Sequence, residues 1–174
     1  SLRFRSGEFV MIGLMGEPVG DKPAKPILRA YSIASPSWDE ELEFYSIIVQ
    51  DGELTSRLKD IKTGDKLAMS AKAVGSLTLS SLTGGGKRLF MLSTGTGVAP
   101  FISIIRDELT YERYDEVYLT QTCRFKKDLQ YAIDRVEDAK NCPLVGEEAT
   151  EKLRLYSTVT REPHEYEGRI TNLI

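Results

Sequence analysis

The pattern of apolar and polar residues divides the chain into two parts with different periods. In residues 1–82, apolar and polar positions alternate in short runs separated by Gly, Pro and Asp turns. The runs read EFVMIGL, ILRAYSIAS, LEFYSIIVQ, DKLAMSA and VGSLTL. A period near two in short, regularly spaced runs is typical of antiparallel strands. The first part therefore predicts an antiparallel β-barrel or sandwich.

One short helix is expected within this part. The stretch LTSRLKDI follows the turn DGE and places Leu54, Leu58 and Ile61 at helical spacing. We take Thr55 or Ser56 as its N-cap, because a hydroxyl group can accept a hydrogen bond from a free N–H of the first turn.

A boundary is expected at TGGGK, residues 83–87. Three consecutive glycines form a flexible connection and are unfavourable inside a strand. We therefore expect one domain over residues 1–83 and a second over residues 87–174.

The second part alternates between strands and helices. RLFMLST is a continuous apolar run, as expected of a parallel strand buried on both faces. APFISIIRDELTYER predicts one amphipathic helix. The residues expected on its apolar side are Phe101, Ile104, Ile105 and Leu109. Strand DEVYLTQTC, helix KKDLQYAIDRVEDAK and strand LRLYSTVT follow. The predicted fold class is thus an antiparallel β-barrel followed by part of a doubly wound, parallel-sheet α/β domain.

Composition narrows the function classes. The 174 residues are 41% hydrophobic and 28% charged, with a net charge of −3. A negative charge without a Lys/Arg block argues against nucleic-acid binding, and no apolar run is long enough to span a membrane. Two cysteines, Cys123 and Cys142, and one histidine favour neither a disulfide framework nor a metal site. We expect a cytoplasmic monomer. Both ends fall within expected elements, so we also expect a fragment.

The turn STGTGVAP joins the first parallel strand to its helix. Gly95 and Gly97 permit positive φ and a close approach of a phosphate to the backbone. Pro100 suits the first turn of a helix, where free N–H groups would face a pyrophosphate. The alternative is a purely structural βα turn, because Pro100 stands where the dinucleotide-binding motif has its third glycine.

Three arginines follow the parallel strands. Arg124 ends TQTCR, Arg161 follows Thr160 after the third strand, and Arg169 comes back across the next loop. Ligands of open α/β sheets bind at this edge, and guanidinium groups hold a 2′-phosphate by charge-assisted bonds. The second strand ends without an acidic residue for a free ribose 2′-hydroxyl, which favours NADP over NAD. The alternative is that these arginines are only solvated.

The stretch RAYS places Arg29 and Tyr31 on one face of a strand, and Ala30 and Ser32 on the other. A cation beside an aromatic ring suits a ligand with a phosphate near a flat ring. The alternative is an arginine stacked on a tyrosine at the rim of the barrel. FYSIIV adds an aromatic pair on the adjacent strand, and LTSRL adds N–H groups at a helix start, a second anion site.

In this order, RAYSIASP, DGELTSRL, GTGVAP, TVTRE and GRIT resemble the ferredoxin–NADP⁺ reductase family, and most of all its bacterial branch. The resemblance runs through nearly the whole chain. It implies a β-barrel domain that binds FAD, an α/β domain that binds NADP(H), and ferredoxin or flavodoxin as the partner. The family's later Cys-Gly strand and its C-terminal tail have no counterpart here, and the first barrel strand is incomplete.

The resemblance also implies roles for single residues. Arg29 would bind the FAD phosphates. Three positions would be catalytic: Tyr31 stacked on the isoalloxazine, Ser32 near flavin N5, and Thr96 between flavin and nicotinamide. The FAD-binding set is Arg29, Ala30, Tyr31, Ser32, Phe44, Tyr45, Ser46, Ile47, Leu54, Thr55, Ser56 and Thr96. The NADP-binding set is Gly95, Gly97, Val98, Ala99, Pro100, Arg124, Thr160, Arg161 and Arg169. Strict alternation points the Ser32 side chain away from the flavin, so a bulge or its backbone N–H is required.

The implied reaction passes a hydride from NADPH to FAD and single electrons from FAD to ferredoxin or flavodoxin. It needs no general acid or base, in agreement with the single histidine. Three alternatives stay open. They are an oxygenase reductase component of the same architecture, a nucleotide-binding flavoprotein subunit that carries electrons without turnover, and a two-domain scaffold without a cofactor.

Overall fold

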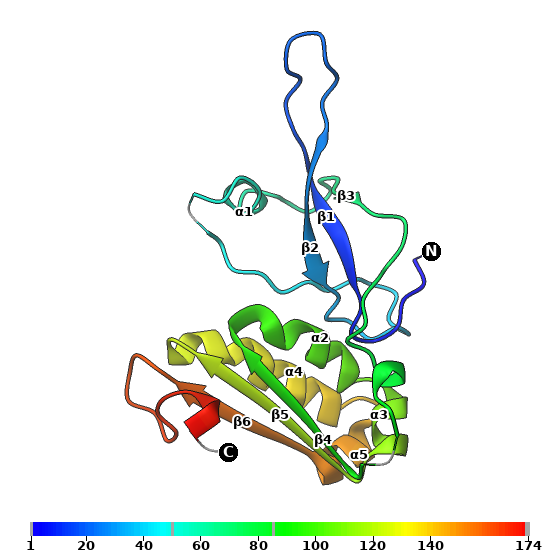
Figure 1. The fold of residues 1–174 in the computed structure, drawn as a ribbon, viewed down its shortest axis with the longest axis vertical. Helices are drawn as coiled ribbons and strands as arrows, with labels where there is room; N and C mark the ends of the chain where they lie inside the picture. Colours follow the sequence, from blue (N-terminus) through cyan, green and yellow to red (C-terminus); the bar gives the residue numbers. More distant parts are fainter. Residues whose placement is uncertain (1, 50, 85, 173–174) are drawn as a thin grey trace.

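The computed structural model describes residues 2–49, 51–84 and 86–172. These residues form two parts, each built on its own sheet (Figure 1). The first part contains an antiparallel sheet and the second a parallel sheet with helices, which confirms the predicted fold class. Gly85, the middle residue of the expected triple-glycine boundary, lies outside the described residues, and the two domain ranges stay predictions.

The first part contains three strands in the spatial order β2-β1-β3, namely β1 (Phe9–Met15), β2 (Pro26–Ser32) and β3 (Ala68–Met69). Strands β1 and β2 form a hairpin that pairs along its whole length without a bulge, and its tip projects away from the rest of the molecule (Figure 1). Gly13 permits this pairing, since a Cβ there would lie 1.8 Å from the carbonyl oxygen of Ile27.

A small core lies on one face of this hairpin. Val10, Ile12 and Ile33 are buried there, and Tyr31 and Phe44 pack against them. Paired residues of antiparallel strands share a face, so the pairs Val10↔Tyr31 and Ile12↔Arg29 put Arg29 and Tyr31 on the core face. The predicted sharing of one face by these two side chains is confirmed.

Two further runs that were predicted as strands pair at single positions only. LEFYSIIVQ contributes a bridge between Phe44 and Ile33, and its last residue, Gln50, lies outside the described residues. VGSLTL contributes a bridge between Val74 and Phe9, followed by the 3-10 turn η1 (Leu79–Ser81). Alternation indicates which side chains face the core, but it does not require a long ladder. Phe44 packs against the core, partly buried, with a single paired residue. The strand prediction was therefore too long here.

The predicted helix in this part is shorter than expected, because α1 spans only Thr55–Leu58. Leu54 occupies the N-cap position, and the Thr55 hydroxyl instead donates to the carbonyl oxygen of Val49 at 3.0 Å. The predicted hydroxyl N-cap was wrong. Leu54 is buried as expected, whereas Ile61, which lies beyond the helix end, is 41% exposed.

The second part contains three parallel strands in the order β4-β5-β6, namely β4 (Arg88–Thr94), β5 (Glu116–Cys123) and β6 (Leu153–Val159). The connecting elements are η2 (Gly95–Val98), α2 (Ala99–Ile104), α3 (Glu108–Arg113), η3 (Lys126–Leu129), α4 (Gln130–Lys140) and α5 (Gly146–Lys152), and η4 (Ile170–Asn172) follows β6. The predicted order strand–helix–strand–helix–strand is confirmed. Helix α5 was not predicted.

Strand β4 corrects the prediction of a strand buried on both faces. Its exposure alternates, with Leu89 and Met91 buried, but Phe90 58% and Leu92 48% exposed. Phe90 stacks on Tyr118 of β5 with ring centroids 4.8 Å apart. The described helices pack on the face that carries Leu89 and Met91, so the other face of the sheet is open among the described residues.

The expected single helix over 99–113 is two helices. The chain leaves helical geometry at Asp107, whose side chain accepts a hydrogen bond of 3.1 Å from the N–H of Leu109 and caps α3. Asp is a favoured N-cap residue for this reason. Ile104 and Ile105 are buried and Phe101 is half-buried, as predicted, but Leu109 is 41% exposed because α3 starts in a new direction.

Within the described ranges, no helix combines the length and the apolarity that a membrane crossing would need. The same residues contain no group of three or more His, Cys, Asp or Glu side chains placed to bind a metal ion. Cys123 and Cys142 are both free thiols, the first buried and the second partly so, and such cysteines pack as small apolar residues.

Candidate functional site

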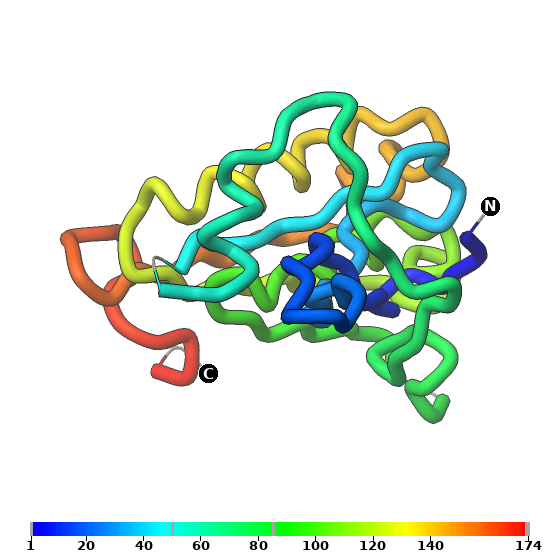
Figure 2. The backbone as a smooth tube through the Cα atoms, turned by 90° about the horizontal axis from the view of Figure 1, so that it is seen from above, coloured from blue at the N-terminus to red at the C-terminus, as the bar shows by residue number. Residues whose placement is uncertain are grey.

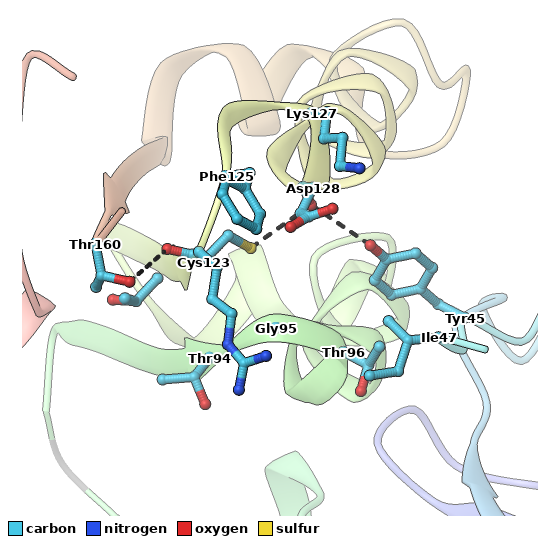
Figure 3. Close-up of a pocket in the computed structure, with 12 residues that line it drawn as sticks. Tyr45, Ile47, Thr94, Gly95, Thr96, Cys123, Phe125, Lys127, Asp128 and Thr160 are labelled. Atoms are coloured by element: carbon cyan, nitrogen blue, oxygen red, sulfur yellow. Dashed lines mark hydrogen bonds between the residues drawn. The ribbon is translucent and has the colours of Figure 1, made fainter. Parts of the chain in front are cut away.

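A cleft of about 580 Å³ lies at the carboxyl ends of the parallel strands, where ligands of open α/β sheets bind. Figure 3 shows Tyr45 and Ile47, which come from the first part of the molecule, on one side of it. Thr160 and Cys123 lie on the other side. The lining residues are Tyr45, Ile47, Thr94, Gly95, Thr96, Thr122, Cys123, Arg124, Phe125, Lys127, Asp128 and Thr160.

The glycine turn forms the floor of this cleft. Gly95 has φ of +51°, a conformation that a glycine adopts at little cost, whereas Gly97 does not have positive φ and that part of the prediction was wrong. A Cβ on either glycine would meet no atom within 4 Å, so the space next to the turn is open. Pro100 lies in the first turn of α2, as predicted. Val98 and Ala99 are buried beneath the turn.

Hydrogen bonds join the walls of the cleft at Asp128. Its carbonyl oxygen accepts from the Tyr45 hydroxyl at 3.4 Å and from the Cys123 thiol at 3.6 Å (Figure 3). Burial, together with the nearby Asp128 carboxylate, raises the pKa of the Cys123 thiol. Burial likewise raises the pKa of Tyr45. Both groups stay neutral at neutral pH, so the cleft offers neither a thiolate nucleophile nor a phenolate base.

The three predicted arginines follow β5 and β6 at this end of the sheet, but only Arg124 lines the cleft, and Arg161 lines a second pocket beside Thr160. The N–H of Arg161 donates to the carbonyl of Arg124 at 3.1 Å, which places the two residues side by side. The loop then returns to β6, where the N–H of Gly168 donates to Val159 O at 2.8 Å, and Arg169 follows. All three arginines are exposed. Among the described residues, none of them forms an ion pair with a carboxylate.

The predicted FAD-phosphate residue, Arg29, lies outside the cleft. Its guanidinium donates to the Glu53 carboxylate at 3.0 Å and to the Leu28 carbonyl at 2.8 Å. Glu53 directly precedes the LTSRL stretch, so Arg29 and the predicted anion site at Leu54, Thr55 and Ser56 are neighbours.

The pairing of β2 with β1 determines the directions of the Ser32 side chain and of its backbone N–H. The ladder contains no bulge, so its side chain lies on the face opposite to Tyr31, together with that of Ala30. The N–H of Ile33 donates to Glu8 O at 3.0 Å, which makes Phe9↔Ser32 a pair without direct hydrogen bonds. The Ser32 N–H therefore points away from β1, toward the outer edge of β2.

The stretch 44–47 is divided between two environments. Phe44 packs into the small β core, whereas Tyr45 and Ile47 line the cleft next to Thr96 (Figure 3). The Ser46 hydroxyl donates to the Ile47 carbonyl at 3.2 Å and is exposed. The structure thus brings Thr96 together with Tyr45 and Ile47. It places the RAYS and LTS residues elsewhere on the first part.

Sequence reasoning missed several lining residues, namely Thr94, Thr122, Cys123, Phe125, Lys127 and Asp128. A signal was available, because the last residues of a parallel strand and the first residues after it form the ligand-binding edge. Phe125, Lys127 and Asp128 directly follow Arg124, and the Lys127 ammonium lies 5.9 Å from the centre of the Phe125 ring.

Comparisons with known proteins agree with this arrangement. No family model matches the chain. A flavodoxin/ferredoxin–NADP reductase of Rhodobacter capsulatus is 53% identical over 172 residues, 99% of this chain and 62% of that protein. A ferredoxin–NADP reductase of Azotobacter vinelandii is 48% identical over 174 residues, 100% of this chain and 65% of the relative. Over nearly its whole length, the chain is thus similar to ferredoxin–NADP reductases.

A solved structure shows the same similarity. The ferredoxin NADP⁺ reductase of Neisseria gonorrhoeae, a structure with bound FAD and NADP, matches with a TM-score of 0.81 at 28% identity. The match covers 99% of this chain and 64% of that chain. The present chain therefore spans less than two thirds of the family members that it matches.

Proposed function

We propose that this chain forms the FAD- and NADP(H)-binding region of a reductase that exchanges electrons between NADP(H) and ferredoxin or flavodoxin. The observation that supports this most is the cleft at the carboxyl ends of β4, β5 and β6. It combines an open glycine turn, a wall formed by Tyr45 and Ile47, and Arg124, whose backbone neighbour Arg161 lines the adjacent pocket. Residues 1–83 would form the FAD-binding domain and residues 87–174 the NADP-binding domain.

The residues of the cleft suit a dinucleotide with a 2′-phosphate. The open space at Gly95 and Gly97 accommodates a pyrophosphate close to the backbone. Arg124 and Arg161 are adjacent and cationic, and Arg169 follows on the returning loop. Guanidinium groups without a carboxylate partner among the described residues are free to bind a doubly charged phosphate. This supports NADP(H) over NAD(H).

FAD, when bound, supplies the conversion of a hydride from NADPH into single electrons. The residues of this chain would hold it and orient it. Arg29 would bind its phosphates together with the LTS stretch, and Tyr31 would stack on its ring. Ser32 would contribute its backbone N–H, which already points away from β1. Thr96 would contact the nicotinamide in the cleft, whose neutral Tyr45 and Cys123 play no acid–base part.

The partner and the cellular location are parts of the same proposal. Ferredoxin or flavodoxin would take the electrons, as the names of the relatives say for those proteins. Two free thiols support a cytoplasmic location. The expectation of a monomer stays a prediction.

An absorption spectrum followed by turnover tests the function. The protein reconstituted with FAD should show a bound-flavin spectrum and should oxidise NADPH with ferricyanide, with a preference over NADH. Bound flavin without NADPH oxidation would favour an electron-carrying subunit instead. A protein that does not bind FAD would favour a scaffold. Activity with an oxygenase but not with ferredoxin or flavodoxin would favour an oxygenase reductase.

A further inference from the structure

We propose that Glu43 is a positioning residue of the cleft. Together with Tyr45, it clasps Tyr131 of α4 and so fixes the distance between the two walls of the cleft. We call the contacts of Glu43 and Tyr45 with Tyr131 the clasp. These contacts are all within the chain. Its consequence for hydride transfer rests on the proposed function.

The clasp has two arms on one extended segment. Glu43 and Tyr45 are two residues apart, so their side chains point to the same side. The Tyr131 hydroxyl donates to Glu43 Oε1 at 2.9 Å. The rings of Tyr45 and Tyr131 stack with centroids 3.9 Å apart and planes 6° apart. Tyr131 is therefore held by a hydrogen bond at its hydroxyl group and by stacking on its ring face. In Figure 2 the segment that carries both arms runs across the second part of the molecule.

Ion pairs also connect the two parts of the molecule at Glu43. Glu43 in the first part pairs with two cations of the second, Arg106 at 3.4 Å and Arg135 at 3.5 Å. In the Arg106–Glu43 pair, the Arg106 side chain is 13% exposed and the Glu43 side chain 28%. Solvent therefore screens this pair less than a surface ion pair. The Arg135 guanidinium also lies 5.9 Å over the Tyr131 ring. Burial and the Glu43 carboxylate raise the pKa of Tyr131, so its hydroxyl stays a donor.

Tyr45 connects the clasp with the cleft, because it contacts Tyr131 and also lines the cleft. It lines the cleft on the same side as Ile47 and Thr96 (Figure 3), and its hydroxyl donates to the carbonyl of Asp128 at 3.4 Å. Glu43 itself does not line the cleft. It acts through Tyr131 and Tyr45, and without it Tyr131, on which Tyr45 stacks, loses the hydrogen bond that fixes its position. A gap of the wrong width lowers the rate of a reaction between two bound groups more than the affinity for either.

The chain offers a matched pair of variants. Tyr131→Phe removes the hydroxyl bond to Glu43 and keeps the ring. Tyr118→Phe removes a like bond, from Tyr118 to Glu116 at 2.6 Å. Tyr118 also stacks on an aromatic ring, that of Phe90, but on the open sheet face away from the cleft. Glu43→Gln serves as a second test, since it removes the charge that Arg106 and Arg135 share.

Two measurements separate positioning from stability. In protein labelled with 3-fluorotyrosine, the Tyr45 fluorine resonance, assigned through Tyr45→Phe, should shift or broaden in Tyr131→Phe but not in Tyr118→Phe. In the FAD-loaded protein, Tyr131→Phe should slow flavin reduction by NADPH about 5- to 10-fold, a modest loss for misplaced reactants. The Kd for adenosine 2′,5′-bisphosphate, which reaches only the arginine side, should stay within about 2-fold.

Each outcome decides the proposal. If Tyr131→Phe behaves like Tyr118→Phe in both measurements, the clasp does not position the cleft. If the wild-type protein shows no flavin reduction, the proposed function fails, and the fluorine spectra alone then decide whether the clasp exists. If Tyr131→Phe does not fold, the same two measurements on Glu43→Gln decide instead.

Discussion

The side chain of Gln121, fully buried in β5, donates a hydrogen bond of 2.9 Å from Nε2 to the carbonyl oxygen of Gly95. Gly95 opens the turn that forms the floor of the cleft, and its φ is +51°. The neighbouring strand thus holds this turn in place from below. The other amide atom, Gln121 Oε1, is buried without a hydrogen-bond partner among the described residues.

Gln121→Leu should weaken the binding of NADP⁺ and leave the fold intact. It removes a neutral hydrogen bond that contributes about 1 kcal/mol, so the Kd should rise about 5-fold. It also removes an unpaired buried acceptor that costs about 1–3 kcal/mol. The two effects oppose each other, so the free energy of unfolding should not fall and should rise by at most about 2 kcal/mol. Calorimetric titration with NADP⁺ and chemical denaturation measure the two effects.

The control for this variant is Ser93→Ala, which removes a buried bond of 2.6 Å from Ser93 to Thr120 O in the same sheet. It should leave the Kd for NADP⁺ unchanged. An unchanged Kd in Gln121→Leu as well would show that the turn keeps its shape without the Gln121 amide.

Arg29→Ala should weaken FAD retention. The guanidinium reaches Glu53 at 3.0 Å beside the LTS stretch, where the phosphates of FAD would lie. Loss of a charge-assisted phosphate contact, worth about 1.5–3 kcal/mol, should raise the Kd for FAD at least about 10-fold. The quenching of FAD fluorescence on binding measures it. An unchanged flavin content would contradict the assignment of Arg29.

Glu53→Gln should have the opposite effect. The Glu53 carboxylate competes with a phosphate for Arg29, and its negative charge repels that phosphate. The pair is exposed and contributes little by itself, so its loss costs little. The Kd for FAD should fall about 2- to 3-fold at low salt, and the difference should vanish at high salt. Asp115→Asn, which removes the same charge from a pair with Lys87, should not change it.

Asp107→Ala should destabilise the α/β part. The Asp107 side chain accepts from the N–H of Leu109 at 3.1 Å and caps α3, and loss of such a cap costs about 1 kcal/mol. The midpoint of thermal unfolding should fall by a few degrees, while Glu112→Ala, in the same helix, should have less effect. Equal shifts for both variants would mean that the cap contributes nothing.

The sequence predicted what local patterns determine. Period-two runs predicted β1 and β2, and the glycine turn with Pro100 predicted the start of α2. The break at Asp107 was also within reach, because Asp before Glu108 is an N-cap signal. It was missed since the apolar period continued across it.

Other features depend on tertiary contacts that no local pattern contains. Phe90 has the hydrophobicity of a buried strand residue, and only the position of the helices leaves it exposed. That Tyr45 lines the flavin stays a prediction, and its stack on Tyr131, 86 positions further along the chain, is a contact that no local pattern contains. The Gln121–Gly95 bond likewise joins two elements whose register a sequence pattern does not fix.

Arg161→Ala should raise the KM for NADPH far more than that for NADH. The residue lies next to Arg124 through a backbone hydrogen bond of 3.1 Å, is exposed, and has no carboxylate partner among the described residues. Only NADPH carries the 2′-phosphate that this guanidinium would bind, so the charge-assisted contact, about 1.5 kcal/mol at an exposed site, is lost for NADPH alone. The KM ratio should change about 10-fold. Arg154→Ala is the matched control, because it removes the same charge from the opposite end of β6, where Arg154 donates to the Leu153 carbonyl. Equal changes of both KM values in Arg161→Ala would contradict the 2′-phosphate role.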